Sequence, residues 1–185
     1  MPRPVLSSAE SRRPLVAAAA IDAFARGGFH ATTVADVARG AKISSAYVFK
    51  LFSGKNAVFV AALERCFDEI LAALERGADA AEEQSADAVL DAMGAAYAQL
   101  IADRRLLLLQ VHAQSVADVP EIGAALRAGL ARVTSFAKTR SGATDDEVQR
   151  FMAFGQLCHL IVTAQIWDLP DDWAKTLTHG VRHPG

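Results

Sequence analysis

The sequence contains only two cysteines, Cys66 and Cys158, and neither forms a CxxC pair or another metal-ligand spacing. This excludes a disulfide-stapled fold and a cysteine-ligated zinc module. Both cysteines lie within apolar helical patterns, so we expect reduced, buried thiols. A redox-sensing pair is the alternative, because thiol reactivity depends on exposure and local charge, which a sequence does not show.

No uncharged apolar run approaches the ~20 residues that a membrane-spanning helix needs. The N-terminal segment imitates a secretory signal, since Arg3, Arg12 and Arg13 precede an alanine-rich apolar stretch. Asp22 interrupts that stretch, and the same residues fit an amphipathic helix. We therefore expect a cytoplasmic protein with no membrane partner.

The sequence also lacks a recognisable catalytic arrangement. It has no nucleophile with a nearby base and orienting residue, and no glycine-rich phosphate loop. His179 and His183 have the i, i+4 spacing of two metal ligands, but no third ligand accompanies them. We expect a protein that is not an enzyme and that uses no metal and no cofactor.

Aromatic residues are scarce, at 7% of the chain, whereas hydrophobic residues make up 52% and are rich in alanine and leucine. This composition favours helices over sheets, and no segment shows the alternation of a strand. The 185 residues suffice for a sizeable core in one or two domains. The sequence therefore predicts an all-α protein.

Residues 33–55 predict two short helices joined by a tight turn, followed by the start of a third. Thr33 is placed to cap the first helix, with Asp36 near its positive N-terminal end. Gly40 and Ala41 permit a turn, and Ser44 caps the second helix. A short second helix with polar and aromatic residues on its outer face is typical of a helix-turn-helix that enters the DNA major groove.

This stretch and the segment before it resemble the DNA-binding domain of the TetR family of bacterial transcriptional regulators. The resemblance covers about residues 12–63 position by position. It rests on a small residue and Phe24, a glycine and an aromatic, the threonines before Val34, a buried valine and isoleucine, and the closing aromatic-x-x-Phe-x-x-Lys. It implies an N-terminal three-helix DNA-binding head followed by a helical ligand-binding and dimerisation domain.

The resemblance also implies roles for single residues of the head. Thr33 and Lys55 would contact phosphates, whereas Lys50 and the segment Ser44, Ser45, Ala46 and Tyr47 would face base edges. Phe49 occupies the position of the family's phosphate-contacting tyrosine. Because Phe49 has no hydroxyl, it is limited to packing against the sugar or backbone, and Tyr47 is the candidate to supply the missing hydroxyl.

The charge distribution agrees with this interpretation. Residues 1–56 contain eight basic and three acidic side chains, although the whole chain has a net charge of -2. The first third would therefore attract a polyanion, and the rest would repel it. A chance imbalance on solvated helices is the alternative.

We predict a flexible arm at residues 1–11, the helix-turn-helix domain at 12–56, a connecting helix at 57–76 and the ligand-binding and dimerisation domain at 77–185. Helix one should span about 12–27, and Ser53 should cap the connecting helix. The apolar spacing after residue 86 predicts further helices, the longest at 145–168 behind a capping box.

Helix 145–168 carries apolar residues on two faces, which one partner within its own domain would not require. We expect it to pack against the same helix of a second copy, since most oligomers have twofold symmetry. Burial at the centre of a single chain is the alternative. The residues expected at this dimer interface are Phe151, Phe154, Cys158, Ile161 and Val162.

The resemblance implies an effector cavity within the C-terminal helices. Apolar cavities for small molecules contain a few well-placed polar groups, and several polar residues lie among the apolar faces here. A buried histidine or glutamine on a helix is also commonly part of the core. The expected ligand-binding residues are Met93, Tyr97, His112, Phe136, Met152, Gln156, His159 and Trp167.

The sequence thus favours a ligand-responsive dimeric DNA-binding regulator. It would be a repressor that binds a palindromic double-stranded DNA operator as a homodimer and is released by a small apolar effector. The alternative is a helical dimeric ligand- or protein-binding module with a degenerate DNA-binding head, for which Phe49 is the only hint.

Overall fold

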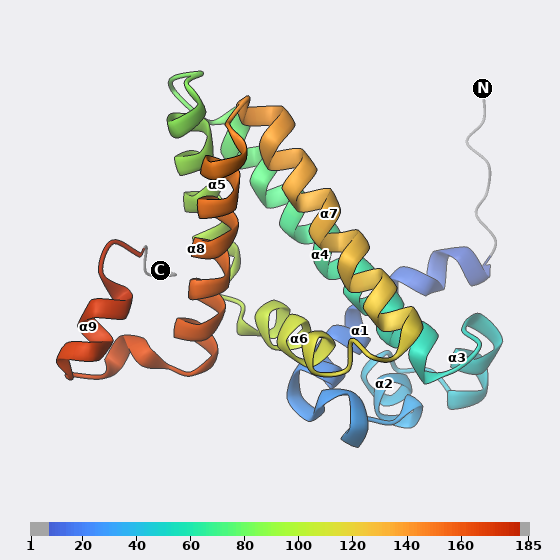
Figure 1. The fold of residues 1–185 in the computed structure, drawn as a ribbon. Coiled ribbons are helices and arrows are strands. Elements are labelled where there is room, and N and C mark those ends of the chain that lie inside the picture. Colours follow the sequence, from blue (N-terminus) through green and yellow to red (C-terminus); the bar gives the residue numbers. More distant parts are fainter. Residues whose placement is uncertain (1–7, 182–185) are drawn as a thin grey trace, which may run out of the picture. The chain divides into compact units, whose positions relative to one another are not determined.

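The structure of the protein is a computed structural model that describes residues 8–181, with side chains described from residue 11 onward. Helices account for all of its regular secondary structure in this range, and none is long and apolar enough to cross a membrane. Figure 1 shows their order along the chain: α1 (Ser8–Ala31), α2 (Val34–Gly40), α3 (Ser45–Leu51), α4 (Lys55–Asp79), α5 (Ala86–Leu100), α6 (Arg104–Ser115), α7 (Pro120–Ser141), α8 (Asp145–Thr163), the 3-10 helix η1 (Ile166–Asp168) and α9 (Asp172–Thr178).

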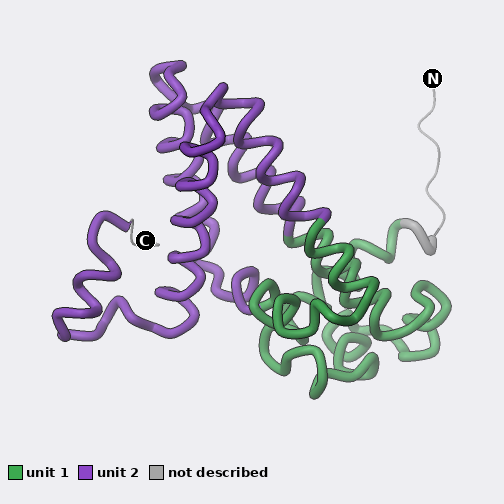
Figure 2. The backbone as a smooth tube through the Cα atoms, in the orientation of Figure 1, with its two compact units in different colours: residues 1–66, 109–127 green, residues 67–108, 128–185 purple. Residues whose placement is uncertain are grey.

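The chain forms two compact units, which are coloured separately in Figure 2. Unit 1 comprises residues 1–66 and 109–127, and unit 2 comprises residues 67–108 and 128–185. Three helices, α4, α6 and α7, contribute residues to both units. The units are therefore not consecutive stretches of sequence, and a linear division of the chain does not describe them. The domain limits given above remain predictions.

An aromatic cluster forms the centre of unit 1. The ring of Phe24 on α1 meets Phe59 on α4 edge to face, with 4.7 Å between their centroids, and Phe59 meets Phe29 in the same way at 5.3 Å. Phe24 and Phe59 are fully buried. Edge-to-face pairs stabilise a core beyond their burial alone, so α1 and the start of α4 form a firm support for α2 and α3.

Within unit 2, α4 and α7 approach closely at Gly129. A Cβ atom added to Gly129 would lie 2.1 Å from Cδ2 of Phe67, so the ring packs directly on the α7 backbone. Two exposed ion pairs join the same helices: Arg132 with Asp68 at 2.6 Å, and Arg140 with Asp79 at 3.1 Å. Exposed pairs contribute little stability, so apolar packing at Phe67 is the main link.

Helix α8 is held in unit 2 by two small apolar clusters. Val162 packs with Ile101 and Leu107, and Ile161 packs with Ile166 and Ala174. The first cluster joins α8 to α5 and α6, and the second joins it to η1 and α9. The C-terminal end of α8 is therefore covered by its own chain.

The first and fourth helices differ from the prediction at their ends. α1 begins at Ser8, so residues 8–11 of the predicted arm are helical, and residues 1–7 lie outside the described residues. α4 begins at Lys55 after Gly54 and continues to Asp79. Gly77, predicted to end it, lies inside the helix because its missing side chain admits α5: a Cβ there would lie 2.6 Å from the carbonyl oxygen of Ala92.

The predicted helix 145–168 is also too long at its C-terminal end. Its capping box is confirmed, with Glu147 accepting hydrogen bonds from the amide and hydroxyl of Thr144 at 2.7 Å each. α8 ends at Thr163 because Gln165 adopts a left-handed conformation with φ 56°. This conformation is uncommon outside glycine, so the sequence carried no signal for it.

Candidate nucleic-acid interface

The first helix of the predicted helix-turn-helix is α2, and a complete capping box begins it. The Asp36 amide donates to Thr33 Oγ1 at 3.2 Å, and the Asp36 carboxylate accepts from the Thr33 amide at 2.9 Å. Hydrogen bonds from the Thr33 hydroxyl and amide lower the pKa of Asp36, because they stabilise its charged form. The predicted N-terminus of this helix is confirmed.

The turn between α2 and α3 is tight, as predicted from Gly40 and Ala41, and its left-handed residue is Lys42, with φ 56°. The Ile43 amide donates to the Ala38 carbonyl at 3.0 Å, which closes the turn. Ser44 then caps α3 as predicted, accepting from the Tyr47 amide at 3.2 Å. The helix-turn-helix geometry therefore follows from local hydrogen bonds.

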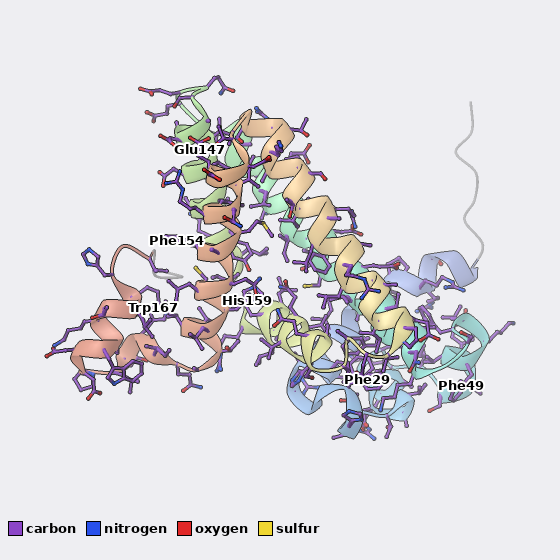
Figure 3. All side chains as sticks on the ribbon, in the orientation of Figure 1. Phe29, Phe49, Glu147, Phe154, His159 and Trp167 are labelled. Atoms are coloured by element: carbon purple, nitrogen blue, oxygen red, sulfur yellow. The ribbon has the colours of Figure 1, made fainter. Side chains whose placement is uncertain are left out.

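Helix α3 has a buried face and an exposed face. Val48 and Leu51 are buried in unit 1, so the opposite side of the helix is free to meet a ligand. Phe49 is 57% exposed, which is unusual for so large an apolar side chain. Figure 3 labels Phe49 on α3. The exposed residues of this face are Ala46, Phe49 and Lys50, and Ser45 and Tyr47 are half-buried beside it.

Two lysines add positive charge to this surface. Lys42 in the turn and Lys50 on α3 are both exposed, and neither has an ion-pair partner among residues 11–181, whose side chains the structure describes. An exposed cation without a carboxylate partner is available to a phosphate. Lys42 was missing from the predicted contacts; its position in the turn next to α3 is the sequence signal that would have found it.

Thr33 and Lys55, predicted to contact phosphates, use their donors within the protein. Both the hydroxyl and the amide of Thr33 donate to Asp36. Lys55 donates to the His30 carbonyl oxygen at 3.1 Å, and its ammonium lies 4.5 Å from the centroid of the Phe29 ring. Lys55 keeps further N–H donors for DNA, whereas Thr33 has none left. Both contacts remain predictions, and the geometry favours Lys55.

Replacing Phe49 with tyrosine should tighten operator binding about fivefold for each head, and so about 25-fold for a dimer with two heads on DNA. The new hydroxyl would extend from an exposed ring and donate to a phosphate, and a single hydrogen bond of this kind contributes about 1 kcal/mol. Fluorescence anisotropy with a labelled operator measures the change. Phe49→Leu, which keeps an apolar side chain without a hydroxyl, serves as control and should not bind more tightly than the original protein. Equal affinity of the Tyr and Leu variants would contradict the placement of Phe49 near a phosphate.

Two of the predicted ligand-binding residues, Tyr97 and His159, are joined by a hydrogen bond of 2.7 Å within unit 2. Met93 is fully buried in the core, whereas Gln156 is exposed. His112 belongs to unit 1, where its ring would lie 3.3 Å from a Cβ atom added to Gly28. The remaining three, Phe136, Met152 and Trp167, are half-buried in unit 2.

The residues predicted for the dimer interface divide into two groups. Ile161 and Val162 are buried within their own chain, and Cys158 packs beside Val162. Phe154 is 52% exposed and Phe151 is half-buried, so these two side chains remain accessible on α8. Leu160 on α8 and Trp173 on α9 are further large exposed apolar residues that the prediction did not include.

Both cysteines are free thiols, and Cys66 is buried. Burial raises the pKa of the Cys158 thiol, which disfavours the reactive thiolate. Within the described part of the chain, no three histidine, cysteine or acidic side chains form a group that could hold a metal ion. His183, half of the histidine pair noted above, lies outside the described residues.

The capped two-helix motif, with its exposed basic and aromatic second helix, places the protein in the class of helix-turn-helix DNA-binding regulators. Residues 16–62 match the family model described as bacterial regulatory proteins, tetR family. Residues 16–62 therefore form a DNA-binding domain of the tetR-family type. No curated protein matches the chain.

Solved structures similar to the whole chain include a TetR-family regulator from Agrobacterium tumefaciens. It is 16% identical, with a TM-score of 0.70, and the match covers 95% of this chain and 96% of that one. FadR from Bacillus subtilis, solved in complex with stearoyl-CoA, is 17% identical with a TM-score of 0.66, covering 89% and 93%. FadR from Bacillus halodurans is 18% identical with a TM-score of 0.63, covering 93% and 97%. At these identities the likeness shows the fold.

Proposed function

We propose that the protein is a homodimeric repressor that binds a palindromic operator and leaves it when a small, largely apolar effector binds unit 2. The observation that carries the DNA-binding part is the outer face of α3, where Phe49 and Lys50 are exposed while Val48 and Leu51 are buried. Such a face needs a partner, and the unpaired lysines favour a polyanion. The protein would act in the cytoplasm, where the bacterial chromosome lies.

The protein would recognise its operator through two kinds of contact, with phosphates and with base edges. Lys42 and Lys55 would bind phosphates and fix the register of the head on the duplex. We now assign Lys50 to a phosphate as well, rather than to the base edges expected above, because its exposed ammonium has no ion-pair partner among the described side chains. Ser45, Ala46 and Tyr47 would face base edges in the major groove, where each base pair presents a distinct pattern of donors and acceptors. Two heads related by twofold symmetry would then read two half-sites one or more helical turns apart.

The exposed apolar side chains of α8 and α9 support the dimer. Phe154, Leu160 and Trp173 are each at least half exposed to solvent in the single chain. Exposed apolar side chains that gather in one patch commonly mark a protein interface, and we infer that these three residues contribute to one. Pairing with the same surface of a second copy would bury them and would supply the twofold axis that a palindromic site requires.

Replacing Phe154 with glutamate should raise the dimer dissociation constant at least tenfold. The change removes an apolar contact on each side of the axis and places two like charges near each other. Sedimentation equilibrium measures the dissociation constant. Gln149→Glu adds the same charge at another exposed position of α8 and leaves the exposed apolar residues in place, so it should leave the dimer intact. An unchanged dimer in Phe154→Glu would place the interface elsewhere.

An effector would act through α4, whose residues belong to the head at one end and to unit 2 at the other. A ligand that binds one arrangement of unit 2 more tightly shifts the population of α4 toward the DNA-free state. An apolar acyl chain is the favoured class of effector, supported by the similarity to FadR solved with stearoyl-CoA. The test is loss of operator binding as an effector is titrated into the protein–DNA complex.

A further inference from the structure

A hydrogen-bonded tyrosine–histidine pair lies inside unit 2 and leaves one polar atom unsatisfied. The Tyr97 hydroxyl on α5 and Nε2 of His159 on α8 are 2.7 Å apart. His159 is only 5% exposed, and among the described residues its Nδ1 atom has no hydrogen-bond partner. Figure 3 shows His159 on α8, farther toward the C-terminal end than Phe154. Buried polar atoms are almost always satisfied, so this atom requires an explanation.

The kind of partner that Nδ1 needs depends on the direction of the Tyr97–His159 hydrogen bond. Burial lowers the pKa of His159 to about 4, so the imidazole is neutral near pH 7. When the Tyr97 hydroxyl donates to Nε2, the single ring proton must be on Nδ1. His159 then presents a buried N–H donor without an acceptor. A ligand oxygen would satisfy it.

Arg104, the first residue of α6, presents a second unsatisfied donor. Its Nη2 donates to the carbonyl oxygen of Thr163 at 2.9 Å, whereas its Nε is buried without a partner. Arg104 has no carboxylate partner among the side chains of residues 11–181. The bond to Thr163 is explained by favourable placement of a cation at the C-terminus of α8. This bond does not explain why Nε is buried without an acceptor or why the guanidinium charge has no carboxylate beside it.

The two unsatisfied donors, His159 Nδ1 and Arg104 Nε, both belong to residues at the C-terminal end of α8: His159 lies in its last turns, and Arg104 binds its last residue, Thr163. His159 and Thr163 lie one helical turn apart, roughly 6 Å along the axis, and the Thr163 hydroxyl donates to the His159 carbonyl oxygen at 2.5 Å. Arg104 donates to the Thr163 carbonyl oxygen, which lies one turn beyond that of His159. A planar group with two acceptor oxygens could therefore accept from both residues. A carboxylate is the simplest such group, and arginine binds it with strong, charge-assisted hydrogen bonds.

Uncrowded backbone at two glycines and an apolar cluster lie on the same helices as these donors. Gly155 lies one turn before His159 on α8, and Gly94 lies three residues before Tyr97 on α5. A Cβ atom added to either glycine would meet nothing within 4 Å. Next to the pair, Ile101, Leu107 and Val162 form a buried apolar cluster against which Tyr97 and Cys158 pack. Polar donors beside apolar walls suit a molecule with one charged end.

We propose that Arg104 and His159 bind the carboxylate of an apolar carboxylic acid, with Tyr97 positioning the His159 ring. This inference rests on the proposed function, because it names the chemical class of the effector for unit 2. Tyr97 holds the imidazole in the tautomer that donates to the ligand, and Arg104 supplies the charge. A ligand with the same apolar chain but no carboxylate would lose its hydrogen bonds to both Arg104 and His159.

The test compares decanoate with 1-decanol, which has the same chain length and no charge, by isothermal titration calorimetry on the full-length protein. We expect decanoate to bind at least tenfold more tightly. Arg104→Gln should remove this preference, since charge-assisted hydrogen bonds account for about tenfold to a hundredfold in affinity. Arg105→Gln is the matched control, because Arg105 is the adjacent arginine but is exposed and paired with Asp103 at 2.6 Å.

The ratio of the two affinities within each folded variant separates binding from stability, since Arg104 also holds the end of α8. Tyr97→Phe keeps the ring and should reduce the preference for decanoate about threefold to tenfold by freeing the imidazole tautomer. Equal binding of decanoate and decanol to the original protein would overturn the proposal. So would an equal loss of preference in Arg104→Gln and Arg105→Gln.

Operator binding measured on the same samples distinguishes failure of the site from failure of the proposed function. If decanoate binds with the expected preference but does not release the operator, the carboxylate site is supported and the effector role is wrong. If the operator is bound and neither probe binds, the carboxylate site is wrong while the DNA-binding function stands.

Discussion

The variant Gly129→Ala should unfold far more easily than the original protein. Its Cβ atom would lie 2.1 Å and 2.2 Å from Cδ2 and Cε2 of Phe67, well inside contact distance. Phe67 is 1% exposed, so its ring has no open space into which it can move. Overpacking of a tight core costs about 1–3 kcal/mol, and we expect the upper end of this range.

Gly94→Ala is the matched control, since Gly94 also lies inside a helix but a Cβ there would meet nothing within 4 Å. Alanine is the better helix former by about 1 kcal/mol, so this variant should be slightly more stable than the original. Thermal unfolding at equal protein concentrations measures both, because a dimer's melting temperature depends on concentration. Equal melting temperatures of the two variants would contradict the close approach of α4 and α7 within unit 2.

Lys50→Glu should weaken operator binding about a hundredfold at low salt. Lys50 is exposed on α3 without an ion-pair partner among the described residues, so the change replaces an attraction for phosphate by a repulsion. In a dimer the change occurs in both heads, and about tenfold per head gives the total. Loss of one phosphate contact per head should also lower the slope of log affinity against log salt by about 2.

Lys138→Glu controls for the change in net charge. Lys138 is an exposed residue of α7 in unit 2, paired with Asp145, and it lies far along the chain from the helix-turn-helix. This variant should bind the operator within about threefold of the original protein, since screening limits the reach of a distant charge. Anisotropy titrations at several salt concentrations measure the affinity and the slope. Equal losses in the two lysine variants would show that net charge, not contact by α3, determines binding.

The sequence predicted the head well because its structure is decided locally. Thr33 with Asp36 and Ser44 with Tyr47 lie three residues apart, and each side chain caps the helix that immediately follows it. The capping box at Thr144 was confirmed for the same reason. Hydrogen bonds over such short spacings depend on residue types that can be read directly from the chain.

Features that depend on distant residues could not be predicted in this way. Gly77 had the sequence signature of a helix end, but contact with Ala92 explains why a glycine is needed within α4. Lys42 and Gln165 adopt left-handed conformations that their residue types disfavour. Tyr97 and His159 are 62 positions apart, so only the fold shows that they share a hydrogen bond.

The predicted ligand-binding residues illustrate the same limit. Periodicity suggested residues that face the interior of the C-terminal helices, but Gln156 is exposed, and periodicity does not show which residues meet. His112 was grouped with His159, although the two histidines belong to different units. Arg104 was overlooked because an arginine at the start of a helix resembles a solvated residue. Its buried Nε is visible only once the end of α8 is in place.

The central claim is that α3 reads DNA, and footprinting of the purified protein on DNA flanking its own coding sequence tests it most directly. The experiment uses two salt concentrations, non-specific competitor DNA, and the Lys50→Glu variant in parallel. We predict two symmetric protected half-sites that weaken as salt rises and that disappear in the variant. Protection that is equally strong with Lys50→Glu, or the absence of any preferred fragment at both salt concentrations, would contradict the account.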